Sequence, residues 1–285
     1  MTTTAVAAPI KARRVRFDWD RTPIHWIPDD PQTTHTINVL HLLLPAGEKW
    51  FVNVYRQALP LVRDETLREQ VRGFMGQEAT HSRAHAAVLE HLAAQGIDTA
   101  RYTRLVDFGF ERLLGDRPLG VRMPARFWLK RRLAIIAAIE HFTAVLGTWI
   151  IEDSSALDDA GADPVMLDLL RWHGAEEVEH RSVAFDLFEH VSGSYLARLV
   201  TMLGVFVAMV VAWVAGLIYF MRTDPLKPGR TSWRRFRRAQ KRGRLPGMKV
   251  LLGAVPRYLE RSYHPSQEGN TERALTYLAA SPAVA

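Results

Sequence analysis

The sequence has 285 residues, of which 48% are hydrophobic, so it can bury a sizeable core in one large domain. It contains no cysteine, which excludes disulfides, thiolate-bound zinc, iron–sulfur clusters and cysteine nucleophiles. The net charge of +7 is uneven, because residues 222–261 hold 13 Lys or Arg against 2 Asp or Glu. Any metal site must therefore use His, Asp and Glu, which suits iron, manganese or zinc.

The chain begins with a stretch rich in Pro, Thr and Asp, and we expect residues 1–35 to form an irregular arm. Beyond it, apolar residues recur at helical spacing between short breakers. They predict helices over 36–60, with a break near Pro45, and over 63–95, 98–115, 124–152, 163–191, 194–221, 245–260 and 269–280. Asp163 and Pro164 suit the N-cap and the first position of the helix at 163–191.

This order of elements predicts an all-α protein with four parts. The arm at 1–35 precedes a four-helix bundle at 36–193. Additional C-terminal helices follow: one long and strongly apolar helix at 194–221, and short helices within the basic segment at 222–285.

The first candidate for a functional site is the segment FMGQEATHSRAHAAVLEHL, residues 74–92. On a helix, Glu78, His81 and His85 fall within about 60° of one another, because each residue advances by about 100°. Taken alone, such a stripe is typical of a polar surface helix with chance histidines. Whether this stripe marks a functional site depends on whether other helices supply further residues of the same kind.

Those partners are present in the other long helices. His173, Glu177 and His180 share one stripe of the helix at 163–191, so a second Glu-x-x-His motif appears. Glu48 and Glu140 each interrupt an apolar run on another predicted helix. The set is therefore one Glu, one Glu-x-x-His, one Glu and one Glu-x-x-His on four successive helices.

This is the donor set of ferritin-like carboxylate proteins that hold two iron or two manganese ions. Four carboxylates cancel the combined charge of two divalent cations, whereas burying them without a metal is costly. We expect two iron ions, with manganese or zinc as alternatives, held by Glu48, Glu78, His81, Glu140, His173, Glu177 and His180.

Several neighbours are candidates for an additional ligand or for a partner that orients one. His85 follows His81 by one helical turn, and an orienting role is the favoured reading. Asp186 and Arg181 are candidates for orienting the histidines. Glu176 lies four residues before His180, which leaves an alternative register open.

Two resemblances refine the expectation. The His-x-x-x-Glu-x-x-His spacing at 173–180 resembles di-iron N-oxygenases that oxidise p-aminobenzoate-type arylamines, which implies an extra histidine on one iron. Over most of its length the chain resembles a bacterial family described as predicted metal-dependent hydrolases, through segments such as GQEATHSRAH and WHGAEEVEHRSVAFDLF. Near its end the chain departs from that family's usual stretch with SYHPSQEG, and we assign this region no catalytic role.

The leading function is a di-iron oxygenase or oxidase that uses O₂ to oxidise a C–H or N–H bond of a hydrophobic or aromatic small molecule. Electrons would come from an external donor such as a ferredoxin or reductase, because the chain carries no flavin or iron–sulfur motif. One alternative is a two-metal hydrolase of an ester or phosphate. Another is a non-catalytic, ferritin-like metal-binding protein.

The apolar segment Leu199 to Met221 has 23 residues without a formal charge, which is long enough to span a bilayer. The basic segment after it favours an anionic membrane surface over nucleic acid. A single span would place residues 1–198 outside the cell, and MTTTAVAAPIKARRVRF lacks an export signal. We therefore expect a cytoplasmic protein, peripheral or monotopic on the inner face of the cell membrane. The alternative is a helix buried in the core or in a homodimer.

Overall fold

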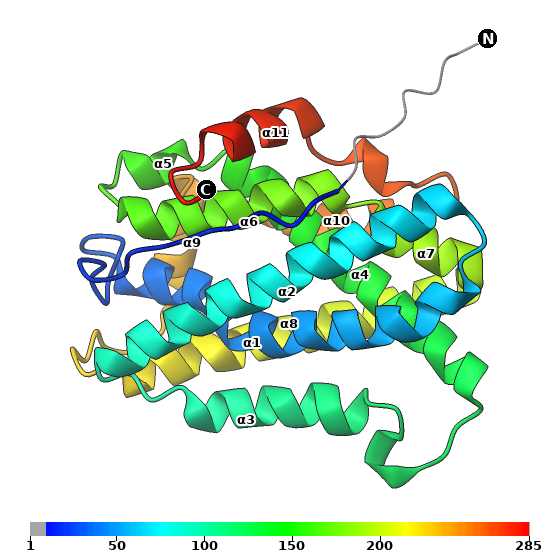
Figure 1. Ribbon diagram of the computed structural model, residues 1–285. Helices are drawn as coiled ribbons and strands as arrows, with labels where there is room; N and C mark the ends of the chain where they lie inside the picture. The colour runs from blue at the N-terminus through cyan, green and yellow to red at the C-terminus, as the bar shows by residue number, and fades with distance from the viewer. Residues whose placement is uncertain (1–9, 285) are drawn as a thin grey trace.

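The computed structural model describes residues 10–284, and this part of the chain is built from helices (Figure 1). Within it, the one contact of β type is an isolated antiparallel bridge between Val15 and Val284. The all-α fold class is confirmed. The first nine residues of the predicted arm lie outside the described residues.

Four long helices enclose the central core: α1 (Pro31–Ala58), α2 (Glu65–Ala94), α4 (Ala125–Glu152) and α6 (Pro164–His180). Helix α1 packs on α2, α2 on α6, α6 on α4, and α4 on α1. The ring is closed, so a side chain pointing inward from any of them is removed from water.

Aspartates fix where three of these helices begin. Asp30, Asp64 and Asp163 each accept a hydrogen bond from the backbone N–H three residues further on. Because Asp30 caps α1 and Pro31 takes the first helical position, α1 begins five residues before the predicted residue 36. It also continues through Pro45 without the predicted break.

The predicted helix at 163–191 is wrong as a single element. Helix α6 ends at His180, and α7 (Val183–Val191) follows after a break at Arg181 and Ser182. The guanidinium of Arg181 donates to the Val178 carbonyl in the last turn of α6, and its Nε donates to the Pro265 carbonyl at 3.1 Å. These bonds satisfy a carbonyl at the end of α6 and attach the C-terminal segment there.

The remaining helices cover the bundle from outside. Helices α3 and α8 pack on α1, α10 on α4 and α8, and α11 on α6. Helix α9 lies in the stretch of the basic segment before residue 245, for which no helix was predicted. The bounds are Leu59–Leu61 (η1), Ala100–Phe108 (α3), Gly109–Leu113 (η2, a π-turn), Pro118–Gly120 (η3), Ser155–Asp158 (α5), Tyr195–Thr223 (α8), Trp233–Lys241 (α9), Met248–Leu259 (α10), Pro265–Gln267 (η4) and Thr271–Ala280 (α11).

The described part of the N-terminal arm is extended and crosses the bundle beside α2 and α6 (Figure 1). Its Arg16 N–H donates to the Ala283 carbonyl at 3.0 Å, so the two ends of the described chain meet. A Cβ placed on Gly73 of α2 would lie 2.2 Å from the Ile10 carbonyl oxygen. Glycine at this position therefore lets the arm lie directly on α2.

Helices α4 and α6 also approach closely through glycines. A Cβ on Gly174 would lie 2.4 Å from Cγ2 of Ile150, and one on Gly147 would lie 2.5 Å from the Gly174 carbonyl oxygen.

We expect Gly174→Ala to lower the free energy of unfolding by about 1–3 kcal/mol through overpacking, measured by urea unfolding. Gly204→Ala in α8 is the matched control: its Cβ meets nothing within 4 Å, so no loss is expected there.

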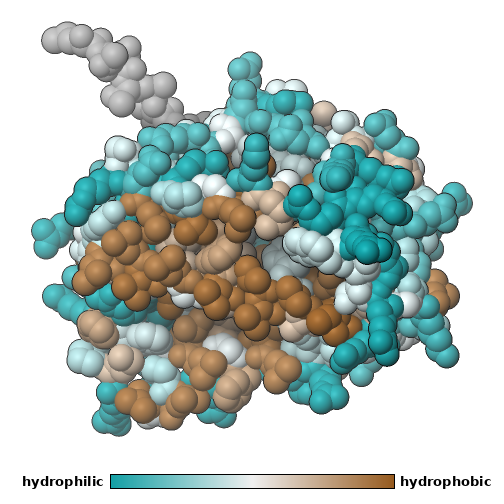
Figure 2. Space-filling view, turned by 180° about the vertical axis from the view of Figure 1, so that it is seen from behind, coloured by the Kyte–Doolittle hydropathy of each residue, from teal (hydrophilic) through white to brown (hydrophobic). Residues whose placement is uncertain are grey.

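Two helices are long and apolar enough to cross a bilayer by length and composition, and their environments differ. The apolar window of α4 is 72% buried, which identifies a core helix, whereas that of α8 is 17% buried. Figure 2 shows hydrophobic side chains gathered over much of the molecular face seen from behind. Helix α8 thus packs on the bundle with one side only.

Candidate metal centre

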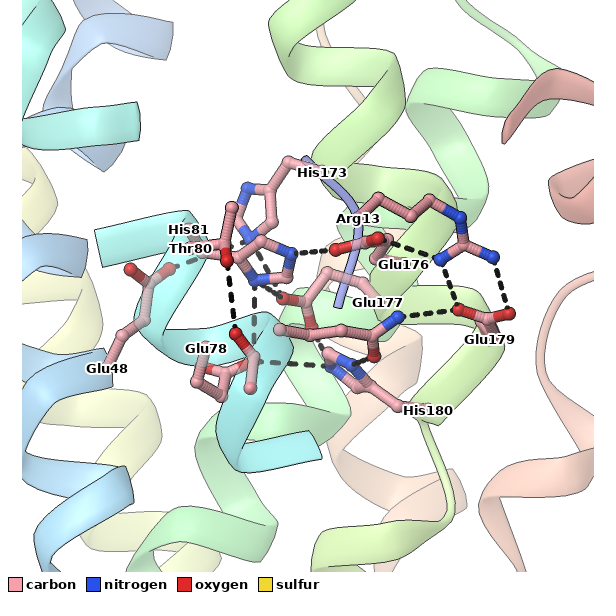
Figure 3. A network of polar contacts seen from close by, with 12 residues as sticks. Arg13, Glu48, Glu78, Thr80, His81, His173, Glu176, Glu177, Glu179 and His180 are labelled. Atoms are coloured by element: carbon pink, nitrogen blue, oxygen red, sulfur yellow. Dashed lines mark hydrogen bonds and ion pairs between the residues drawn. The ribbon is translucent and has the colours of Figure 1, made fainter. Parts of the chain in front are cut away.

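All seven predicted ligands lie inside the bundle and come from its four long helices. Figure 3 labels all of them except Glu140. None of them is more than 6% exposed. Glu48 projects from α1, Glu78 and His81 from α2, and Glu140 from α4; His173, Glu177 and His180 project from α6.

Two of the groups that their donor atoms form share no residue, and the atoms of each group lie within 4.8 Å of one another. Glu177 reaches both: its Oε1 lies 2.8 Å from His173 Nε2, and its Oε2 lies 3.3 Å from His180 Nε2. Glu78 Oε1 is similarly placed, 3.4 Å from His81 Nδ1 and 3.5 Å from His180 Nε2. These two donor groups are Glu48, His81 and His173, and Glu78, Glu140 and His180. A third group, of Glu78, His81 and Glu177, overlaps both.

The buried carboxylates of the site would be stabilised by bound cations. Both carboxylate oxygens of Glu48, Glu78 and Glu140 are buried without a hydrogen-bond partner. Burial and neighbouring carboxylates raise the pKa of all three, that of Glu78 to about 8. Burial would also raise the pKa of Glu177, but His180 and His173 hold it well below its usual range. Four converging carboxylates with three imidazoles fit two divalent cations.

A charged pair outside the donor groups orients His81. His81 Nε2 lies 2.8 Å from Glu176 Oε2, and Arg13 donates to Glu176 Oε1 at 2.7 Å. Although burial opposes ionisation, His81 and Arg13 lower the pKa of Glu176. A charged Glu176 accepts the Nε2–H of His81, which leaves Nδ1 of that ring without a proton and facing Glu78 and Glu177. Glu176 is thus a partner of His81 rather than a member of the donor groups.

The same arginine reaches the second histidine through two side chains. His180 Nδ1 donates to Gln77 Oε1 at 2.9 Å, and Gln77 Nε2 donates to Glu179 Oε2 at 2.6 Å. Arg13 then donates to both Glu179 oxygens, at 2.7 and 2.8 Å. Sequence reasoning missed Arg13 and Gln77 because neither lies on the stripes of predicted ligands.

His85 lies behind His173 rather than among the carboxylates. Its Nε2 is 2.9 Å from His173 Nδ1, and its Nδ1 is 2.7 Å from Nδ1 of His41 on α1. Burial lowers the pKa of His85 well below its usual range and that of His41 to about 3, so both rings are neutral. His41, which sequence reasoning missed, thus extends a row of three imidazoles away from the site.

Asp186 and Arg181 do not contact the site histidines, so their predicted orienting role is wrong. Asp186 Oδ1 lies 2.9 Å from Nε2 of His264, and Arg181 bonds the C-terminal segment. The break after α6 is the cause, because it carries both residues off the helix face that a straight helix would have presented to the bundle.

The Asp186–His264 pair predicts a pH dependence of stability. The hydrogen bond to Asp186 raises the pKa of His264 above 6.5. Its stabilising contribution is therefore fully present below pH 6.5 and is lost as pH rises through the folded-state pKa. We expect the difference in urea midpoint between wild type and Asp186→Asn to shrink over that range, and an unchanged difference would contradict this.

A second buried cluster lies where the end of α8 meets the start of α1. His25 Nε2 and His35 Nε2 lie 2.6 and 2.7 Å from the same oxygen, Asp224 Oδ2. The ring of His35 also stacks on Phe220, with ring centroids 5.2 Å apart. The sequence analysis did not identify this cluster. Because both imidazoles already bond one carboxylate oxygen, we interpret it as a structural contact that holds the end of α8 to the start of α1.

An apolar cavity of about 470 Å³ lies beside the donor groups. It is bounded by α1, α4, α6, α8, α9 and α10, and it reaches His173 and Glu177. Among its lining residues in the described chain, these two are the only ionisable ones. The donor groups are thus accessible from an apolar space.

Residues 11–269 match the family described as "predicted metal-dependent hydrolase", and this range contains every residue of the two donor groups. No curated protein and no solved structure matches the sequence. The match covers most of the chain, and the buried carboxylates and imidazoles are side chains that could hold a metal ion. The chain therefore belongs to the family of predicted metal-dependent hydrolases.

Proposed function

We propose that this chain is a dinuclear-metal enzyme that acts on an apolar molecule bound in the cavity beside α6. The proposal rests on His173 and Glu177, which belong to the converging donor atoms and also line the cavity. A molecule in the cavity would therefore lie against the metal ligands. Two bound cations would supply Lewis acidity at that point, and iron would also supply a redox couple.

The cavity wall is apolar and therefore selects for apolar molecules. Phe142, Leu146 and Leu170 form part of the wall close to the bundle, and Phe206 and Trp213 of α8 continue it outward. An apolar chain enclosed by these side chains gains free energy by leaving water. Its polar group would be held at the end of the cavity where His173 and Glu177 lie.

Hydrolysis is the first candidate reaction, because the family description names it. An ester or phosphate with an apolar chain would fit the cavity with its polar group at the donor groups. The ring nitrogens of His173, His85 and His41 form a hydrogen-bonded row that leads away from the site and holds His173 in place from behind.

Oxidation with O₂ is the second candidate, and the donor set itself favours it. Four carboxylates offset the charge of two cations, which weakens their Lewis acidity and stabilises a higher oxidation state of iron. The alternation of Glu and Glu-x-x-His on four helices is that of ferritin-like di-iron proteins. This reaction would require an external electron donor such as a ferredoxin or reductase. A non-catalytic metal-binding role would leave the cavity unexplained.

A comparison of metals and oxygen separates the two reactions. The full chain is loaded with zinc or with ferrous iron and given p-nitrophenyl palmitate, with and without O₂ and dithionite-reduced ferredoxin. Hydrolysis predicts nitrophenol release with zinc under argon. Oxidation predicts no release under argon and O₂ consumption by the iron form when an apolar aromatic amine is added. Failure to bind either metal would contradict the proposal.

A further inference from the structure

One side of α8 is an exposed apolar stripe. Leu196, Val200, Leu203, Val207 and Val211 are between 52% and 71% exposed, and they recur at three- or four-residue spacing along the helix. The stripe runs from Leu196 to Val211, which is about 22 Å at 1.5 Å per residue. Soluble monomers rarely expose apolar surface of this extent, so it calls for a partner.

The cavity beside α6 opens on the same face. Val210 and Val214 of α8, Trp233 of α9 and Leu252 of α10 all line the cavity, and they are between 46% and 66% exposed. Figure 2 shows a hydrophobic area that is continuous over much of this face. The mouth of the cavity is therefore set in apolar surface rather than in a polar rim.

Basic side chains border this face at both of its ends. Arg234, Arg238 and Lys241 are exposed on α9, which follows the end of α8. The segment 112–127 projects at the end of the molecule where α8 begins (Figure 1). There, exposed arginines alternate with exposed apolar residues: Arg112, Leu113, Arg117, Leu119, Val121, Arg122, Arg126 and Phe127.

This combination favours an anionic bilayer over a second copy of the chain. An apolar face with basic borders is the pattern of helices that lie in the interface of anionic membranes. In a two-fold dimer formed through α8, parallel or antiparallel pairing would bring the basic ends of the two copies together, which is repulsive.

Helix α8 is held to the bundle and so lies along the membrane surface rather than across it. Tyr102 of α3 donates its hydroxyl to the Ala212 carbonyl at 2.6 Å, and Trp213 Nε1 donates to the Thr36 carbonyl at 2.8 Å. A Cβ on Gly216 would lie 3.0 Å from Val39 of α1, so these helices are in close contact.

We propose that this face docks on an anionic lipid bilayer and that the cavity opens into the region of the acyl chains. The substrate class is then a membrane-dissolved apolar molecule, which enters from the bilayer without crossing water. The substrate part rests on the proposed function, whereas the docking part stands on the surface alone. It would place the protein on the inner face of the cell membrane.

Vesicle flotation of the full chain tests the docking. The chain should float with phosphatidylcholine vesicles that contain phosphatidylglycerol, at least about tenfold more than with phosphatidylcholine alone, and salt should weaken the binding. Val200→Glu combined with Val207→Glu should reduce flotation at least about tenfold. Leu275→Glu on α11 is the matched control and should float like wild type. Equal flotation of all three proteins, or none by wild type, would overturn the proposal.

Tryptophan fluorescence tests which face meets the lipid. Acyl chains brominated along their length should quench wild-type fluorescence, and Trp233→Phe should remove part of the quenched signal. Trp19→Phe, on the N-terminal arm, should leave the quenched signal unchanged. Flotation without a contribution from Trp233 would mean that another face binds, and the proposed cavity entrance would be wrong.

Two further readouts separate the alternatives. If light scattering shows a wild-type dimer that the α8 variant converts to a monomer, the occupant is a second copy and the proposal fails. The α8 variant should keep the metal content of wild type, because Val200 and Val207 lie outside the donor groups. Vesicle binding by a chain that holds no metal would support the docking surface and contradict the proposed function.

Discussion

Replacing Glu177 with alanine is expected to reduce the metal content from about two ions per chain to one or none and to abolish turnover. The reason is geometric: Glu177 places one oxygen near His173 and the other near His180, so its removal takes a carboxylate oxygen away from beside both donor groups. The measurement is elemental analysis of the purified chain after equilibration with excess metal and desalting.

The matched control is Glu189→Ala, which removes an exposed glutamate from α7 and should leave two ions bound. If Glu177→Ala retained the full metal content, the assignment of Glu177 as the carboxylate that serves both donor groups would be wrong. Loss of folding is monitored by circular dichroism, so that metal loss can be separated from unfolding.

Arg13→Ala should weaken metal binding about 10- to 100-fold, as expected when residues that orient metal ligands are disturbed. Arg13 bonds Glu176 and Glu179, which in turn orient His81 and, through Gln77, His180. Removing the guanidinium also leaves the buried Glu176 carboxylate without its cation, at a cost of about 3 kcal/mol in the free energy of unfolding.

A chelator competition titration measures the affinity, and urea unfolding measures the stability. Arg14→Ala is the control, because Arg14 is the exposed neighbour of Arg13 in the same extended segment. A variant that lost stability but bound metal with unchanged affinity would show that Arg13 only fastens the arm to the bundle.

Helical spacing alone was sufficient to identify the candidate metal ligands in the sequence. A Glu-x-x-His motif puts both side chains on one helix face, so Glu78 with His81, and Glu177 with His180, could be paired from the sequence alone. The single glutamates of α1 and α4 were visible because a charge within an apolar run needs a partner. The structure brings all of these donor atoms together, and their role as metal ligands remains the proposal.

Contacts between distant segments could not be predicted in this way. Arg13 meets Glu179 across 166 positions, and no local pattern in the extended arm signals that contact. His41 faces His85 from another helix and has no motif of its own. For Asp186 and Arg181, the helical spacing was continued through Arg181 and Ser182, where α6 ends, and the Arg181 side chain bonds the C-terminal segment instead.

The central claim is that the bundle holds two metal ions close together. Titration of the metal-free chain with Mn²⁺, followed by electron paramagnetic resonance, tests it most directly. We expect the signal of free Mn²⁺ to stay low until about two equivalents are bound. The bound ions should then give a spin-coupled spectrum, as expected for ions about 4 Å apart. Binding of a single uncoupled ion, or no binding, would contradict the account.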